Sequence, residues 1–167
     1  MRSERSSIFP AIGTTPHWFA RHVVRFVSEG TGAAIYVFTD DHCPPHVHAR
    51  HRGEGWVARV RFSYVTNAVV LISIAPLKNV PLQRVVNRLL DDIQTRLADC
   101  RRSWWQTKRT TCLANQWGVM STAGKIELRS ERMREAKQIA DASYDLATER
   151  LRATFRDGTT AEVITQP

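Results

Sequence analysis

The sequence lacks the features that mark a membrane protein. No run of apolar residues approaches the roughly 20 that a helix needs to cross a bilayer. The longest run, at residues 68–72, is only as long as a strand. Residues 1–5 are mostly polar, and no apolar stretch that would complete a signal peptide follows them. We therefore expect a cytoplasmic protein that does not contact a membrane.

Cysteine is scarce as well, with only three residues in a chain of 167. Cys43, Cys100 and Cys112 lie far apart in the sequence and form no CxxC pair. An odd number of cysteines at such spacing gives no sign of a disulfide framework. The sequence therefore predicts three reduced thiols, most of them buried.

Several signatures of common enzymes are also absent. The chain has no GxSxG turn for a nucleophilic serine, no glycine-rich phosphate loop and no compact acidic group for magnesium. These absences leave the question of catalysis open and favour a protein that is not an enzyme.

What the sequence has in excess is positive charge, with a formal net charge of +8. The excess is concentrated in residues 78–109, which hold 8 Lys and Arg against 3 Asp and Glu. A basic surface of this kind attracts nucleic acids and acidic protein partners.

This basic segment also contains tryptophan. Cations can contact phosphates while an aromatic ring stacks on unpaired bases. The alternative is that Trp104 ends an apolar helix stripe and that the cations are simply solvated. The candidate residues for nucleic-acid or partner binding are Arg101, Arg102, Trp105, Lys108 and Arg109.

Short apolar and β-branched stretches predict strands in the first half of the chain. They cover residues 35–39, 46–50, 56–62 and 68–74, and the last is apolar enough to be central in a sheet. No crossover helix separates them, which favours an antiparallel meander. The longest apolar stripe, over residues 81–105, predicts one long amphipathic helix that covers this sheet.

Two further helices are expected outside this core. The spacing of apolar residues predicts helices at 17–29 and 131–152, followed by a β-hairpin at 153–164 around an Asp-Gly turn. The expected fold class is therefore α+β. A small antiparallel sheet of about four strands is covered by a long amphipathic helix, with extra N- and C-terminal helices and a C-terminal β-hairpin.

The same pattern divides the chain into three parts. Residues 1–32 are expected to form an N-terminal extension with a helix, and residues 33–109 an α+β core. Residues 110–167 follow as an appendage made of the C-terminal helix and hairpin. This length suits one domain with an appendage.

Histidine is concentrated in one short stretch, residues 42–51, which holds four of the six in the chain. Residues two apart in a strand point the same way, so His46 and His48 are expected to project from one face, near Asp41. Two imidazoles with a nearby thiolate or carboxylate can bind zinc or another divalent metal ion. The candidate metal ligands are His46, His48, Cys43 and Glu54.

Two other roles are open to the same residues. In the first, the histidine rings have a structural role and simply hydrogen-bond to the backbone or to Asp40 and Asp41. Two prolines would hold this part of the chain extended. A hydrolase would instead need a general base and a charge stabiliser. The residues that could fill these catalytic roles are His46, His48, Glu54 and Arg50.

These histidines belong to a motif, Asp41-His42-Cys43-Pro44-Pro45-His46-Val47-His48, which follows a strand at 35–38 and precedes Gly53-Glu54. The motif resembles the signature of a family of small bacterial proteins of unknown function: a strand, Asp-His-x-Pro-Pro-His-x-His and a short Gly-Glu turn. The resemblance covers residues 33–106 and includes a long helix that ends in tryptophan.

The resemblance implies a component of a toxin–antitoxin-like locus. Members of the family are often encoded beside a second small family, which residues 153–167 resemble in their strand, Asp-Gly turn and strand. No catalytic residues are implied by the resemblance.

Two hypotheses for function follow. The first is a non-enzymatic interaction protein of a toxin–antitoxin-like or mobile-element and phage defence system, which binds a protein or a nucleic-acid machine, in one variant as an inhibitor. The alternative is a metal-assisted hydrolase or nuclease centred on His46 and His48. A bound ion with an open coordination position would favour the alternative.

Overall fold

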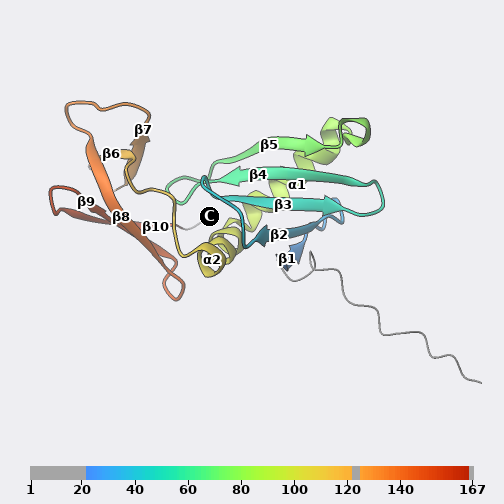
Figure 1. Cartoon of the computed structure of the whole chain (residues 1–167), viewed down its shortest axis with the longest axis horizontal. Coiled ribbons are helices and arrows are strands. Elements are labelled where there is room, and N and C mark those ends of the chain that lie inside the picture. Colours follow the sequence, from blue (N-terminus) through green and yellow to red (C-terminus); the bar gives the residue numbers. More distant parts are fainter. Residues whose placement is uncertain (1–21, 122–124, 166–167) are drawn as a thin grey trace, which may run out of the picture.

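The computed structural model describes residues 22–121 and 125–165, which form two antiparallel five-stranded sheets and two α-helices (Figure 1). The first sheet is a meander in which neighbouring strands follow one another in sequence. Its strands are β1 (His22–Val27), β2 (Ala34–Phe38), β3 (His46–His51), β4 (Trp56–Phe62) and β5 (Val69–Ala75).

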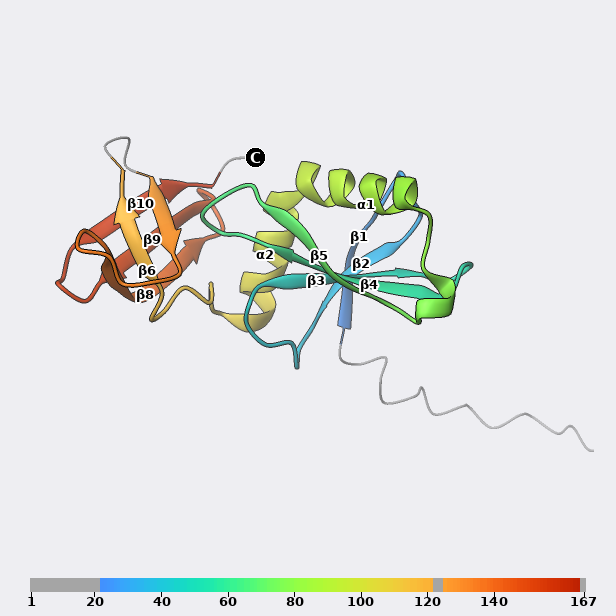
Figure 2. The same ribbon diagram turned by 90° about the horizontal axis from the view of Figure 1, so that it is seen from above.

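Two helices cover one face of the first sheet and leave its other face open among the described elements (Figure 2). A short 3₁₀ turn, η2 (Leu77–Asn79), leads from β5 into α1 (Gln83–Thr95), and α2 (Leu97–Lys108) follows directly. β4 shows why the faces differ, because its residues alternate between buried and more exposed positions. Its buried members are Trp56, Ala58, Val60 and Phe62.

The second sheet lies beyond α2, at one end of the first sheet (Figures 1 and 2). Its strand order is β10-β9-β8-β6-β7. The strands are β6 (Trp117–Met120), β7 (Ile126–Arg129), β8 (Lys137–Asp145), β9 (Arg150–Phe155) and β10 (Thr160–Ile164). No helix in the described part of the chain is long and apolar enough to cross a membrane.

The two sheets and the helices share one hydrophobic core. Trp104 of α2 is fully buried at the end of the first sheet, where its ring lies 6.3 Å from that of Phe62. Tyr64, after β4, and Tyr144 of β8 pack edge to face with ring centroids 5.2 Å apart. Buried aromatic residues therefore connect the two sheets.

The expected α+β fold class was wrong, because the described chain forms two antiparallel five-stranded sheets and only two α-helices. The helix expected at 17–29 is replaced over its described part by β1, while residues 17–21 lie outside the described residues. The segment HVVRFV is dense in β-branched residues, which fit a pleated strand better than a helix.

The prediction of a C-terminal helix at 131–152 was also wrong. Residues 137–155 instead form β8, a tight turn and β9. The Asp145 carboxylate accepts the Ala147 N–H at 2.8 Å, and Glu149 takes a left-handed backbone conformation with φ 54°. The apolar residues here satisfy helical spacing, but this turn divides them between two paired strands.

Two further details of the prediction need correction. The long helix expected at 81–105 is divided at Arg96, whose φ of −109° and ψ of 31° depart from helical values. β5 is an edge strand rather than a central one, and Val70 and Ile72 are 44% and 43% exposed. The expected strands 35–39, 46–50 and 56–62 and the hairpin at 153–164 correspond to β2, β3, β4 and β9–β10.

Candidate metal centre

The histidine motif forms a cluster of three potential metal ligands. Asp41 lies in the loop after β2, and His46 and His48 lie at the start of β3. The His46 and His48 Nε2 atoms lie 3.2 and 2.9 Å from the same Asp41 oxygen, Oδ1. All three ligand atoms lie within 4.8 Å of one another. The prediction that these histidines project from one face near Asp41 is therefore confirmed.

The loop and the strand hold each of these side chains in place. The Phe38 N–H donates to Asp41 Oδ2 at 2.8 Å, which leaves Oδ1 directed at the imidazoles. The His46 ring packs on Trp104, with centroids 5.4 Å apart. His48 lies between two aromatic rings of β2, stacked on Tyr36 at 5.8 Å and edge-on to Phe38 at 4.6 Å.

His46 faces a hydrogen-bond acceptor at both ring nitrogens. Its Nδ1 lies 2.9 Å from the Pro44 carbonyl oxygen, which can only accept, and its Nε2 faces the Asp41 carboxylate. A neutral imidazole carries one N–H, so it can donate to only one of these two acceptors. A metal ion bound at Nε2 would leave the Nδ1–H to donate to Pro44 and would also meet the Asp41 carboxylate. The same carbonyl contact fixes the tautomer in many metal-binding histidines.

The electrostatics keep Asp41 in its anionic form. Burial acts to raise the pKa of Asp41, but hydrogen bonds from His46, His48 and the Phe38 N–H outweigh it and hold that pKa well below its usual range. The side chains are sheltered, since His46 is 2% exposed, Asp41 9% and His48 12%. A charged carboxylate in such a setting favours a bound cation.

Two arginines lie beside the cluster on the open face of the first sheet. Arg61 is paired directly opposite His46, and Arg59 is paired directly opposite His48. Side chains at opposed positions of antiparallel strands share a face. Arg61 is exposed, whereas the Arg59 Nε is buried and has no hydrogen-bond partner among the described residues.

Neither Arg59 nor Arg61 was predicted from the sequence to have a function. The signal was present in the alternation of β4, which puts both side chains on the face away from the helices. The sequence did not reveal the register between β3 and β4, which places these two arginines opposite the two histidines.

The other candidate metal ligands are not part of this cluster. Cys43 is bonded to Cys112 in a disulfide, so the expectation of three reduced thiols was wrong, and only Cys100 is a free and buried thiol among the described residues. Glu54 lies in the turn after β3, at the end of the strand away from His46, and its Oε2 accepts the Trp56 indole N–H at 2.7 Å.

The candidate binding residues of α2 and its C-terminal end do not share one environment. Arg101 is 1% exposed and donates to the carbonyl oxygens of Ser63 and Thr66 at 2.9 and 2.8 Å, and also to that of Thr165. The other four candidate binding residues lie in environments that differ from one another. Arg102 pairs with Glu149, Lys108 donates to the Thr39 carbonyl oxygen, Trp105 is half-buried and Arg109 is exposed.

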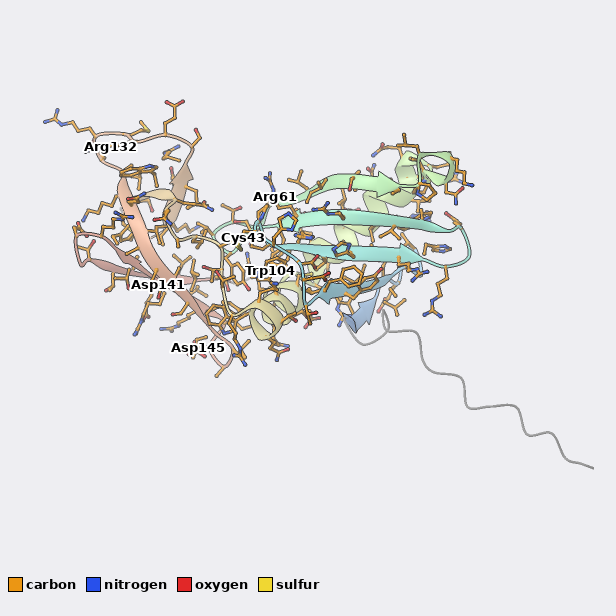
Figure 3. The ribbon with its side chains drawn as sticks, viewed as in Figure 1. Cys43, Arg61, Trp104, Arg132, Asp141 and Asp145 are labelled. Carbon is orange, nitrogen blue, oxygen red and sulfur yellow. A yellow bond between two sulfur atoms is a disulfide. The ribbon has the colours of Figure 1, made fainter. Side chains whose placement is uncertain are left out.

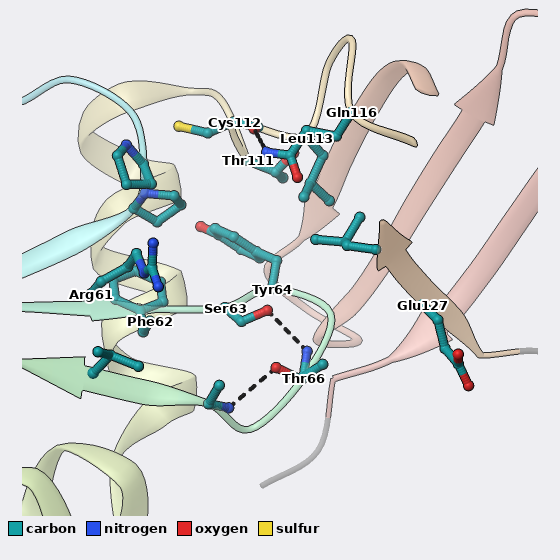
Figure 4. A pocket seen from close by; sticks show the side chains of 15 residues that line it. Arg61, Phe62, Ser63, Tyr64, Thr66, Thr111, Cys112, Leu113, Gln116 and Glu127 are labelled. Carbon is teal, nitrogen blue, oxygen red and sulfur yellow. Dashed lines mark hydrogen bonds between the residues drawn. The ribbon is translucent and has the colours of Figure 1, made fainter. Parts of the chain in front are cut away.

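A cavity of about 400 Å³ lies beside the motif, between the two sheets (Figure 4). Pro44 and Pro45 line it together with Arg61 and Tyr64, and Glu127 and Gln116 contribute from the side of the second sheet. A volume of this order suits a small organic group. Arg61 therefore borders both the open sheet face and this cavity.

The arrangement combines a potential metal site with anion-binding side chains. Two imidazoles and one carboxylate are ligands for zinc and related ions, and three protein ligands leave a position for water or substrate. Guanidinium groups bind phosphate oxygens through paired hydrogen bonds. Together these groups could bind a phosphate ester and polarise it.

The chain matches no protein-family model, no curated protein and no solved structure. A function is accordingly inferred from its own residues and their geometry, and the resemblance to the family of small bacterial proteins stays a prediction.

Proposed function

We propose that the chain is a metal-dependent hydrolase of phosphate esters, with Asp41, His46 and His48 as the metal ligands. The observation that supports this proposal most directly is the convergence of the two Nε2 atoms on Asp41 Oδ1, while the His46 Nδ1 is held by the Pro44 carbonyl. This is the geometry of a ligand set whose metal-binding nitrogens are directed at one point.

Each group has a role in this proposal. A bound divalent ion would polarise a phosphoryl oxygen and lower the pKa of a bound water. Arg59 and Arg61 would hold the phosphate and stabilise the charge that grows on its oxygens. The nucleophilic water would depend on the bound ion for its activation. The water oxygen bonds to phosphorus, and the ester oxygen leaves with a proton.

A second candidate is the non-enzymatic interaction protein of a toxin–antitoxin-like or phage defence system, which binds a nucleic-acid machine or acts as an inhibitor. The near-complete burial of His46 favours it, because a catalytic metal ion needs a coordination position that is open to water or substrate. The cytoplasmic location expected for such a protein conflicts with the Cys43–Cys112 bond, since disulfides persist mainly in oxidising compartments.

Metal content and hydrolysis separate the two candidates. We expect one zinc or manganese ion per chain by mass spectrometry after equilibration and desalting. His46→Gln and His48→Gln should each weaken binding by at least about tenfold, because each removes a ligand. His51→Gln is the matched control, since His51 lies on the same strand but stacks on Trp56 outside the cluster.

Activity is measured on bis(p-nitrophenyl) phosphate with and without added metal ion. Metal-stimulated release of nitrophenol by the wild type, lost in both cluster variants and kept in His51→Gln, supports the hydrolase. A folded wild-type protein that binds no ion would contradict it, and stoichiometric binding without hydrolysis would favour the interaction protein.

A further inference from the structure

The open face of the first sheet has a composition that suits one class of polyanion. Strands β1–β5 contain no carboxylate, and β3 and β4 contribute three arginines to this face, Arg50, Arg59 and Arg61. Cys43, Arg61 and Trp104 mark the end of the sheet nearest the second sheet, where the metal cluster lies (Figure 3). A phosphate chain that crosses the strands at this end would meet Arg59 and Arg61, while the nearby Asp41 carboxylate is already paired with His46 and His48.

Exposed apolar side chains lie beside these arginines. Val70 of β5 is 44% exposed and is paired directly opposite Arg61. Ile72 is 43% exposed on the same edge strand, beside a register shift. Phe38 is half-buried at the other side of the cluster, edge-on to His48. The face therefore offers apolar contacts on both sides of a basic centre.

Single-stranded nucleic acid combines both of these properties. Its phosphates suit the arginines, and its unpaired bases present apolar ring faces that can pack on aliphatic and aromatic side chains. A duplex hides its bases, so Val70 and Ile72 would gain nothing from it.

The buried donor of Arg59 is a second and independent sign of a ligand. Its Nε has no hydrogen-bond partner among the described residues, although buried polar groups nearly always have one. Arg59 and His48 are opposed across β3 and β4, where Cβ atoms lie about 5 Å apart. A phosphate oxygen that accepts from Arg59 would therefore lie close to the candidate metal ligands.

From these observations we infer that the polyanion is a single-stranded nucleic acid, which lies across β3, β4 and β5 with a phosphodiester at Arg59 and Arg61. The inference rests on the proposed function, since it names the substrate of that same site. Binding itself needs no metal ion, so it can be tested apart from hydrolysis.

The test is fluorescence anisotropy with labelled 20-mers of dT and rU, in low salt with a chelator present. We expect the wild-type chain to bind at least one of them. Affinity should fall with salt, by a slope of about −0.7 for each phosphate contact. Arg59→Gln/Arg61→Gln should lower the affinity at least tenfold and flatten the slope by about 1.4, which corresponds to two contacts.

The matched control is Arg132→Gln/Arg134→Gln, which removes the same charge from two exposed positions in the connection between β7 and β8, where Figure 3 labels Arg132. It should keep nearly wild-type affinity. Arg61→Gln alone, at an exposed position, replaces the double variant if circular dichroism shows that the latter is unfolded.

Three results would overturn the inference. They are no binding by the wild type at low salt, equal effects of the two double variants, and equal competition by a 20-base-pair duplex or by polyglutamate. Equal competition by polyglutamate would assign the face to an acidic protein. None of these results bears on metal content or on hydrolysis of the small phosphodiester, so the proposed function succeeds or fails separately.

Discussion

His46 shows how much of the candidate site depends on single residues. Its neighbours Pro44 and Asp41 come from the same motif, so the sequence places all three close together. The motif and strand alternation were therefore enough to predict the shared face of His46 and His48. They were not enough to choose Asp41 over Asp40 as the common partner or to identify Arg59 and Arg61 as neighbours, because those contacts depend on the loop conformation and the strand register.

Cys43 marks the limit of inference from local sequence. Its partner Cys112 is 69 residues away, and nothing in the spacing of three cysteines selects that pair. The pairing arises because the loop before β3 and the segment after α2 meet where the two sheets adjoin.

The remaining thiol, Cys100, provides a prediction at this scale. Burial raises the pKa of Cys100 to about 12. In the unfolded chain the pKa of a cysteine thiol is about 8.5. Between these values the unfolded chain loses a proton that the folded chain keeps, so the free energy of unfolding falls as pH rises. From pH 9 to 10 we expect Cys100 to contribute a decrease of about 1 kcal/mol.

Urea denaturation at pH 7.5, 9 and 10 measures this effect. The comparison is between Cys100→Ala and its parent, both in a Cys43→Ala/Cys112→Ala background that prevents thiol–disulfide exchange. The parent should lose stability more steeply with pH than Cys100→Ala. Equal pH slopes in the two proteins would show that Cys100 is not protected by burial.

At the scale of elements, hydrophobic spacing predicted the central strands and the helical cover but failed at the start of the described chain and in the segment before the C-terminal hairpin. In residues 22–27 and 137–155 the apolar residues fit a helix and a strand about equally well. The choice is made by pairing, since β1 adds to β2, and β8 and β9 pair over most of their length. A single-sequence pattern carries no information on such partners.

The helix α1 gives a prediction for this scale. Leu89 is 1% exposed and belongs to the core beneath α1, so Leu89→Ala should lower the free energy of unfolding by about 2–5 kcal/mol. Leu82→Ala is the control, because Leu82 precedes the same helix and is 63% exposed. Its effect should stay within about 0.5 kcal/mol. Equal shifts in the urea midpoint for both variants would contradict the packing of α1 on the sheet.

At the scale of the whole molecule, one core and several polar contacts join the two sheets. The disulfide joins the loop of the metal cluster to the segment that leads into β6. The cavity between the sheets borders Arg61 on one side and Glu127 on the other. The sequence predicted an appendage after residue 109, whereas the second sheet contributes its buried side chains to the common core.

Arg101 makes the strongest polar connection between the two parts, and its role could not be read from a run of basic residues. Its guanidinium donates to the carbonyl oxygens of Ser63 and Thr66, in the β4–β5 connection, and to that of Thr165, directly after β10. Arg101→Met would leave these three acceptors without their donor in a buried site. We therefore expect the free energy of unfolding to fall by about 2–5 kcal/mol.

The control is Arg102→Gln, because Arg102 is 42% exposed and its ion pair with Glu149 should contribute no more than about 1 kcal/mol. Hydrogen exchange locates the effect of Arg101→Met. Amides of residues 63–66 and 160–165 should lose protection together, since the guanidinium is what couples these segments, while the centre of β3 should change least. Wild-type stability and exchange in Arg101→Met would mean that the shared hydrophobic core alone holds the two sheets together.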